Sequence, residues 1–420
     1  MGNESFNVEK KAIELVLEDN INQKEKLAKT IFDVAHKQEI YPASIHEFYM
    51  ARGRGEFSGF TVPAINLRSM TYDLARAVFR VADKNASGAF VFEIARSEIG
   101  YTNQSPIEFA SMVLAAAIKE DYSGPVFIQG DHFQVNAAKF KDNPDKEIEG
   151  LQSLIGDAIN SGFYNIDIDS STLVDITKPN LKEQQFLNYA VCAKLAKFIR
   201  RVEPKGITIS VGGEIGEIGR QNSTPGDLRA FMAGLEDKLG RALAGTSKIS
   251  VQTGTTHGGL VLPNGSIAQI KLDFDTLKTL SEIARKEYKL AGAVQHGAST
   301  LPPEAFHKFV ECETAEVHLA TEFQNMIYES KHFPAGLKGR IYEWLTVNAA
   351  SEAKQGETKE QFLYKTRKKG LGPFKKEIMS LPQKTRDAIA TEIENKFDFL
   401  FKQLNVVNKR ALVEKYNPRD

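Results

Sequence analysis

Short apolar runs alternate with longer helical patterns through the middle of the chain, and this alternation constrains the fold more than any other feature. Most of the runs are apolar on both faces, as parallel strands covered on both sides must be. Strands that alternate with helices form parallel sheets. We therefore predict an α/β fold with eight parallel strands, at residues 60–67, 89–95, 125–130, 165–169, 207–211, 249–253, 291–295 and 315–320.

The segments between these runs have the 3.6-residue periodicity of amphipathic helices. They lie at residues 71–84, 106–120, 147–160, 181–202, 224–239, 274–287 and 303–312. Eight strand–helix units in about 270 residues have the size of a (β/α)8 TIM barrel. An open doubly wound sheet is the rival arrangement, but it usually has a Gly-rich first turn, and no G-x-G-x-x-G follows the first strand. We predict a catalytic barrel over residues 56–330.

Two further regions flank the predicted barrel. Residues 1–55 form an N-terminal helical extension, with an amphipathic pattern over residues 8–38. Residues 331–420 form a C-terminal helical region, rich in Lys, Glu and Gln, with helical patterns at 339–353, 360–367 and 384–404. We interpret its one basic cluster, residues 365–369 (KTRKK), as a solvated helix end rather than a nucleic-acid patch.

Composition excludes several classes of partner. Lys plus Arg and Asp plus Glu both number 54, so a formal net charge of zero argues against nucleic acid. No apolar run approaches the ~20 residues that span a bilayer, and the N-terminus has no apolar signal segment. The two cysteines, Cys192 and Cys312, are expected to be reduced thiols in a cytoplasmic protein. Any metal site must therefore use histidines and carboxylates.

Three of the eight histidines follow predicted strands directly. His132 comes after Asp131 at the end of the third strand, His257 follows the sixth, and His296 ends the seventh. In a TIM barrel the chemistry lies where strands run into the following loops. A lone histidine there is usually a hydrogen-bonded loop residue, but three on one rim, with an open fourth position, are typical of a catalytic zinc.

Small residues follow two of these histidines, at Gly258-Gly259 and at Gly297-Ala298-Ser299. Such turns leave backbone N–H groups open, and these groups can bind phosphate beside a metal. A covalent alternative to metal chemistry would be a Schiff-base lysine. No lysine lies at the strand ends inspected, which argues against that alternative.

These segments together resemble a known family. The sequences GDHF, TTHGGLV and QHGASTLP are similar to the metal-binding motifs of class II (zinc-dependent) fructose- and tagatose-bisphosphate aldolases. NIDIDSS and GGEIGEIG are similar to that family's segments at the fourth and fifth strands. The resemblance runs from about Phe60 to Glu322, with the motifs in the family's order.

The resemblance implies specific roles. His132, His257 and His296 would hold Zn2+ or another divalent metal, with Asp169 and Glu214 behind these ligands or at an alternative position for a second cation. Of these two carboxylates, we expect Glu214 to have a catalytic role and Asp169 to belong to the metal site. Asp131 would be the acid or base at the C4 hydroxyl. The residues Gly258, Gly297 and Ser299 would face a substrate phosphate. Family members are TIM barrels and form homo-oligomers.

The chain departs from the family pattern at the eighth strand. The family has roughly Asn-x-Asp-Thr-Asp there, whereas this chain has His318, Ala320, Thr321 and Glu322 at the matching positions. His318 is either a substrate contact or a histidine satisfied inside the barrel, and Thr321 is a candidate phosphate contact. Gly212 also replaces one carboxylate of the fifth-strand motif.

The metal and the base are therefore retained, while the substrate end is changed. The leading hypothesis is an aldolase that cleaves or forms the C3–C4 bond of a ketose phosphate through a zinc-stabilised enediolate. One alternative is a ketose 4-epimerase that uses retro-aldol and aldol steps at the same site. Another is a non-catalytic companion subunit of a tagatose-bisphosphate aldolase. The expected partner is a small sugar phosphate, without nucleic acid or membrane.

Overall fold

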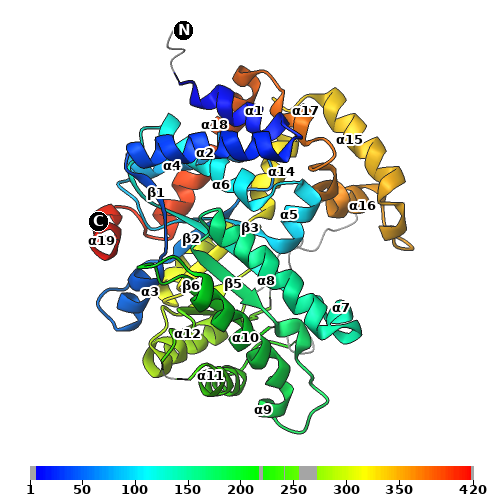
Figure 1. Ribbon diagram of the computed structural model, residues 1–420. Coiled ribbons are helices and arrows are strands. Elements are labelled where there is room, and N and C mark those ends of the chain that lie inside the picture. Colours follow the sequence, from blue (N-terminus) through cyan, green and yellow to red (C-terminus); the bar gives the residue numbers. More distant parts are fainter. Residues whose placement is uncertain (1–5, 217–220, 241, 255–271, 418–420) are drawn as a thin grey trace.

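The computed structural model describes residues 6–216, 221–240, 242–254 and 272–417. Their centre is a closed barrel of eight parallel strands (Figure 1). The strands follow one another around the barrel in chain order, and β9 pairs with β2. These strands are β2 (Val62–Asn66), β3 (Val91–Ala95), β4 (Gly124–Gln134), β5 (Asn165–Asp169), β6 (Ser210–Glu214), β7 (Lys248–Ser250), β8 (Ala293–Gln295) and β9 (Glu316–Leu319). The predicted TIM barrel and all eight of its strands are confirmed.

Helices connect the strands and cover the outside of the barrel. They follow the predicted order, and α4 has the predicted bounds. The connecting helices are α4 (Thr71–Lys84), α5 (Arg96–Thr102), α6 (Pro106–Lys119), α7 (Ala137–Asp142), α8 (Pro144–Asn160), α9 (Leu181–Gln184), α10 (Phe186–Val202), α11 (Pro225–Leu239), α12 (Phe274–Tyr288) and α13 (Phe306–Glu311). Their apolar faces and the outward faces of the strands form the hydrophobic core.

The N-terminal region contains more structure than one amphipathic helix. Asn20 accepts a hydrogen bond from the Gln23 N–H and begins a second helix, so the pattern is divided into α1 (Val8–Leu17) and α2 (Ile21–Lys37). A ninth strand, β1 (Ile40–Ala43), pairs with the start of β4, and α3 (His46–Gly53) follows it. Sequence analysis missed β1 because it is four residues long and half of it is partly exposed.

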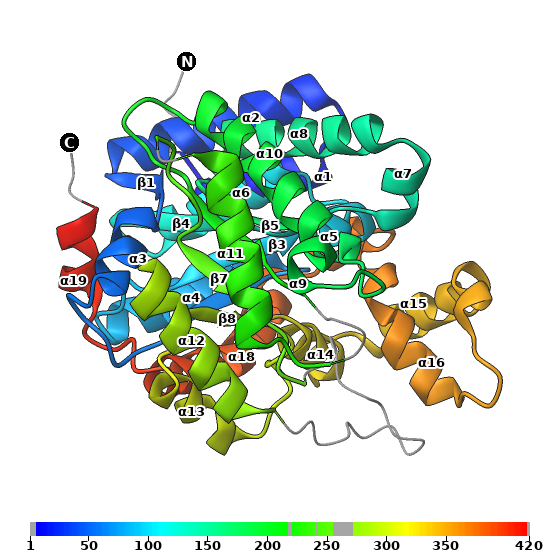
Figure 2. The same ribbon diagram turned by 90° about the horizontal axis from the view of Figure 1, so that it is seen from below.

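The C-terminal helices pack against the barrel shell. After β9 come α14 (Thr321–Glu329), α15 (Ala335–Asn348), α16 (Lys359–Thr366), α17 (Lys375–Met379), α18 (Gln383–Gln403) and α19 (Arg410–Tyr416). Helix α18 packs against α4, and α1 packs against both α6 and α17, while α15 and α16 project to one side (Figures 1 and 2). The division of the chain at residues 55 and 330 stays a prediction. No helix in the described ranges is long and apolar enough to cross a membrane.

Candidate metal centre

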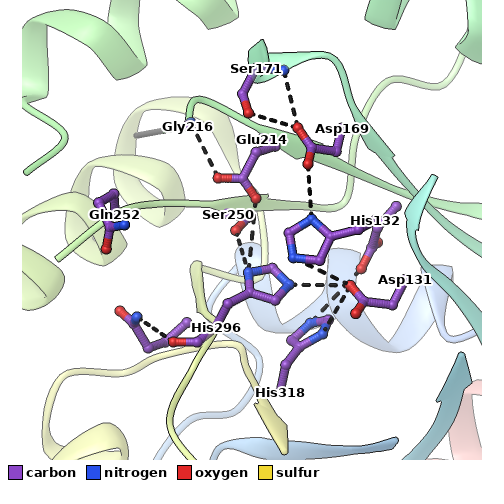
Figure 3. A network of polar contacts seen from close by, with 12 residues as sticks. Asp131, His132, Asp169, Ser171, Glu214, Gly216, Ser250, Gln252, His296 and His318 are labelled. Atoms are coloured by element: carbon purple, nitrogen blue, oxygen red, sulfur yellow. Dashed lines mark hydrogen bonds and ion pairs between the residues drawn. The ribbon is translucent and has the colours of Figure 1, made fainter. Parts of the chain in front are cut away.

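An irregularity at the end of β4 turns two consecutive side chains into the barrel mouth. In a regular strand, Asp131 and His132 would point to opposite faces. The register between β4 and β5 shifts between Gly130 and Phe133, and His132 has a φ of 39°. A bulge of this kind re-aims the side chain that follows it. Asp131 and His132 can therefore lie in one cluster (Figure 3).

Three imidazoles surround one carboxylate oxygen of Asp131. Its Oδ1 lies 3.2 Å from His296 Nε2, 3.3 Å from His318 Nδ1 and 3.9 Å from His132 Nε2. The ring centroids of His132 and His318 are each 4.0 Å from that of His296. The structure thus brings together residues from β4, from the end of β8 and from β9, which the sequence places far apart.

His132 and His296 are each held from behind, His132 directly by a carboxylate and His296 through a serine hydroxyl. Asp169 Oδ2 accepts a hydrogen bond from His132 Nδ1 at 3.0 Å. Ser250 Oγ lies 2.9 Å from His296 Nδ1 and is also hydrogen-bonded to Glu214. A partner on Nδ1 fixes the ring orientation and directs Nε2 toward the cavity, as it does in metal-binding histidines.

The charges of this cluster are strongly coupled. Burial, reinforced by the neighbouring His318 and His132, holds the pKa of His296 well below its usual range. Burial also opposes protonation of His132, but Asp131 and Asp169 outweigh it and raise the pKa to about 10. For Asp131, burial favours the neutral acid, yet His132 and His318 hold its pKa well below the usual range. Asp131 is therefore an ionised carboxylate beside a neutral His296.

A cavity of about 530 Å³ opens beside this cluster. Seven predicted site residues line it: Asp131, His132, His296, Gly297, Ser299, His318 and Thr321. Asp169 and Glu214 lie behind the imidazoles, as described above. The remaining predicted residues, His257 and Gly258, lie outside the described residues.

Comparisons with known proteins identify the family. The sequence matches the family of class II fructose-bisphosphate aldolases over residues 54–402. The chain belongs to this family. Class II aldolases are zinc-dependent and act on sugar phosphates. No curated protein compared with the chain matches it.

Solved structures show the same fold at low sequence identity. A protein named as a tagatose 6 phosphate kinase from Sinorhizobium meliloti 1021 is 16% identical, with a TM-score of 0.56 over 85% of this chain and 99% of that one. A fructuronate-tagaturonate epimerase from Cohnella laeviribosi is 11% identical, with a TM-score of 0.55 over 93% and 85%. A protein named as a fructose-1,6-biphosphate aldolase from Coccidioides immitis is 17% identical, with a TM-score of 0.50 over 86% and 96%. These likenesses establish the fold alone.

The residues present in this member of the class II aldolase family fit a zinc ion. Asp131, His132 and His296 can each offer one ligand atom, and these atoms lie within 4.8 Å of one another. Imidazole and carboxylate are common zinc ligands; His296 is already neutral, and a bound ion would displace the proton that His132 otherwise holds. The carboxylates behind His132 and His296 complete the arrangement expected around a metal.

Below this centre, the barrel interior is polar, which sequence analysis missed. Lys248, at the first residue of β7, donates to Gln129 at 2.7 Å, to Asp167 at 2.9 Å and to Glu316. Burial lowers the pKa of Lys248, but Asp167 and Glu316 outweigh that effect and raise it. The ammonium therefore stays protonated, and Lys248 is unsuited to act as a Schiff-base nucleophile.

Four cationic side chains that were not predicted as site residues also line the cavity: Arg68, Arg96, Lys139 and Lys368. Arg68 is paired with Glu98 at 2.7 Å and Arg96 with Glu147 at 2.6 Å. Arg68 and Arg96 directly follow the first two predicted strands. Inspecting the residues after these two strands, as was done for the later strands, would therefore have identified them. Lys368 comes from the 3-10 turn η4 (Arg367–Gly370) in the C-terminal region. The sequence around Lys368 contains no comparable signal that would place this residue at the cavity.

The basic cluster at residues 365–369 is not simply a solvated helix end, so that interpretation was wrong. Arg367 is only 4% exposed, and it hydrogen-bonds to Asn325 and Glu329 on α14. Its backbone carbonyl accepts a hydrogen bond from the Tyr328 hydroxyl at 3.0 Å. These contacts fix η4 to the barrel and place Lys368 at the cavity.

Proposed function

We propose that this protein is a metal-dependent aldolase that cleaves or forms the C3–C4 bond of a ketose phosphate. The observation that carries the proposal is the carboxylate of Asp131, held among three imidazoles at the mouth of a class II aldolase barrel. Such a carboxylate is a suitable general base beside a metal.

The side chains divide the work of the reaction. His132, His257 and His296 would hold the metal, and a bound zinc would stabilise negative charge that develops on the substrate oxygens. Asp131 would accept the proton of the C4 hydroxyl during cleavage and return it during synthesis. Asp169 orients His132, and we propose this role for it in place of direct metal ligation. Glu214, acting through Ser250, orients His296.

Anionic groups of the substrate would lie at the rest of the cavity. Gly297, Ser299 and Thr321 line the side next to His296 and His318, and we propose that they bind one phosphate together with Gly258. Lys368 has no carboxylate within ion-pair distance in the described part of the chain, and its ammonium lies 5.7 Å from the centroid of the Tyr101 ring. A second anionic group of the substrate beside Lys368 would offset this charge.

A 4-epimerase is the second candidate. Cleavage followed by re-addition to the opposite face of the aldehyde uses the same metal and the same base. The departure at His318, which places a further imidazole 3.3 Å from Asp131, favours this candidate because re-addition needs a second orientation of the aldehyde. The cytoplasmic location and the homo-oligomeric state stay predictions from sequence.

A panel of ketose mono- and bisphosphates, assayed with and without a chelator, tests the proposal. Triose products and 4-epimers are followed separately, so that cleavage and epimerisation are distinguished. We expect turnover of at least one ketose phosphate, loss of that turnover with chelator and recovery with Zn2+. Turnover that chelation leaves unchanged would reject the metal mechanism, and 4-epimers without free trioses would establish the second candidate.

A further inference from the structure

Arg68 connects the first barrel strand to the helix that follows the last one. It lies just after β2, lines the cavity, and its side chain is 14% exposed. Its Nη1 donates to Gln324 Oε1 at 3.2 Å and to Thr321 Oγ1 at 3.5 Å, and both acceptors belong to α14. The guanidinium group of Arg68 therefore lies beside a residue that the proposed function places at a substrate phosphate.

The ion pair with Glu98 orients Arg68 and leaves part of its guanidinium group available. Glu98 Oε1 accepts a hydrogen bond from Arg68 Nε at 2.7 Å. Glu98 Oε2 accepts hydrogen bonds from the Asn66 side chain at 2.7 Å and from the Ala95 N–H at 2.8 Å, so this carboxylate is held in place. In the described part of the chain, Nε and Nη1 of Arg68 have partners and Nη2 has none. The N–H groups of Nη2 can therefore bind a ligand in the cavity.

Two hydroxyl groups and a helix end lie at the same side of the cavity. Thr321 Oγ1 accepts a hydrogen bond from Arg68, and Ser299 Oγ accepts one from the Glu322 N–H at 3.4 Å. Each hydroxyl therefore keeps its own proton to donate. Helix α14 begins here, and its N-cap residue, Ala320, has no side-chain acceptor for the first N–H groups. The positive end of the helix dipole thus adds to the attraction for an anion.

The positive charge of Arg68 is still felt in the cavity although Glu98 is nearby. Burial lowers the pKa of Lys368, and the charge of Arg68 is the next largest cause that lowers it, ahead of the opposite effect of Glu98. Arg68 and Lys368 therefore repel each other at this cavity. An anion bound beside them relieves that repulsion.

We propose that Arg68 is a substrate-binding residue, which holds the phosphate of the ketose phosphate together with Ser299 and Thr321. The inference rests on the proposed function, because that function supplies the phosphate, and it adds a charged donor to a site otherwise made of hydroxyl and backbone groups. A guanidinium group donates two parallel hydrogen bonds to phosphate oxygens. Arg68 thus determines that a phosphorylated ketose is preferred to the corresponding free ketose.

The test measures phosphate binding separately from turnover. Inorganic phosphate is titrated against the full-length chain after chelation and dialysis, so that it cannot bind to zinc, and the phosphorus NMR line width is followed. Arg68→Met should raise the Kd of phosphate by about 10-fold or more, because hydrogen bonds between charged groups are lost. Arg68→Lys keeps the charge but not the planar fork, so its Kd should lie between the two.

Two further variants separate binding from stability and from charge. Arg76→Met is the matched control, because Arg76 is 12% exposed and pairs with Glu120 at 2.6 Å, yet does not line the cavity. Its unfolding free energy, measured with urea, should fall about as much as that of Arg68→Met, while its Kd for phosphate should not change. The double variant Arg68→Met with Glu98→Gln should bind phosphate as weakly as Arg68→Met. Recovery of affinity in the double variant would show that Arg68 only neutralises Glu98, and would overturn the proposal.

Steady-state kinetics of the zinc-loaded protein distinguish this proposal from the aldolase itself. Arg68→Met should raise KM for a ketose phosphate by a factor similar to that for phosphate binding, with little change in kcat. Equal Kd values for phosphate in Arg68→Met and Arg76→Met, or no phosphate binding to the unmodified protein, would reject the role of Arg68 and leave the aldolase. Phosphate binding that depends on Arg68, without turnover of any ketose phosphate, would reject the aldolase and keep the phosphate site.

Discussion

At the scale of single residues, Asp131 is the centre of the proposed chemistry. Its Oδ1 is approached by three imidazoles, and the charges of His132 and His318 keep the carboxylate ionised although it is buried. The buried carboxylate is thus already deprotonated, as a general base must be. Sequence analysis predicted Asp131, His132 and His296 because strand ends gather at one rim. It left the role of His318 open, since its surroundings come from strands that are distant in sequence.

Replacing Asp131 with Asn tests the base directly. An amide of the same shape cannot accept the C4 proton, so we expect kcat to fall by about 10²–10⁴-fold. His132 and His296 remain, so zinc should still bind. Steady-state kinetics and metal analysis check the two expectations. Asp142→Asn on α7, at an exposed carboxylate, is the control. Unchanged kcat in Asp131→Asn would show that another group is the base.

At the scale of elements, the irregular end of β4 determines whether the site forms. The bulge brings Asp131 and His132 into one cluster, and Gly130 makes room for it. A Cβ atom at Gly130 would lie 2.5 Å from the ring of Phe133. The apolar run predicts the strand but not its bulge, because the register shift depends on how β4 pairs with β5.

Gly130→Ala should therefore damage both the strand and the metal centre. Overpacking of this kind typically costs about 1–3 kcal/mol of unfolding free energy, and we also expect weaker zinc binding because His132 is displaced. Urea unfolding and zinc titration measure the two effects. Gly150→Ala on α8 is the matched control, because a Cβ there meets no atom within 4 Å. Alanine should be neutral or stabilising at that helical position. Equal stability and zinc affinity in both variants would contradict the role of Gly130.

Helix α3 contains a histidine that links stability to pH. His46 is 6% exposed, and its Nδ1 has no hydrogen-bond partner. Burial, with a smaller contribution from Arg200, lowers its pKa to about 4. The unfolded chain therefore binds a proton below about pH 6.5 that the folded chain does not bind until about pH 4, so acidification favours unfolding across this interval.

His46→Gln should remove this part of the pH dependence. Between pH 7 and pH 5, the unfolding free energy of the unmodified protein should fall by about 2 kcal/mol relative to that of the variant. Urea unfolding at both pH values measures the difference. His36→Gln changes an exposed histidine on α2 and should leave the pH dependence as it is. Parallel curves for the unmodified protein and His46→Gln would show that His46 has the same pKa in the folded and the unfolded chain.

At the scale of the whole molecule, the site combines the barrel with the C-terminal region. Sequence analysis predicted the barrel well, since apolar runs and helical patterns are local signals. It missed the polar interior because residues such as Glu93 and Lys248 interrupt apolar runs and have their partners on other strands. A sequence signal for the polar interior does exist: polar residues spaced two apart on one strand lie on the same face. Gln129 and Asp131 have this spacing, as do Glu316 and His318. The family match to residue 402 agrees with a C-terminal region that contacts the cavity.

The last prediction concerns this contact between the C-terminal region and the cavity. If Lys368 faces an anionic group of the substrate, Lys368→Met should raise KM by about 10-fold or more, because a hydrogen bond to a charged group contributes about 1.5–3 kcal/mol. Lys369→Met removes the neighbouring charge, which is paired with Glu352 and does not line the cavity, and should change KM by less than about twofold, as is typical of exposed pairs. Metal content should be the same in both variants. Comparison of substrates with a terminal phosphate, carboxylate or hydroxyl shows which anion is bound. An equal loss on all three would mean that Lys368 supports the fold of η4 and not the substrate.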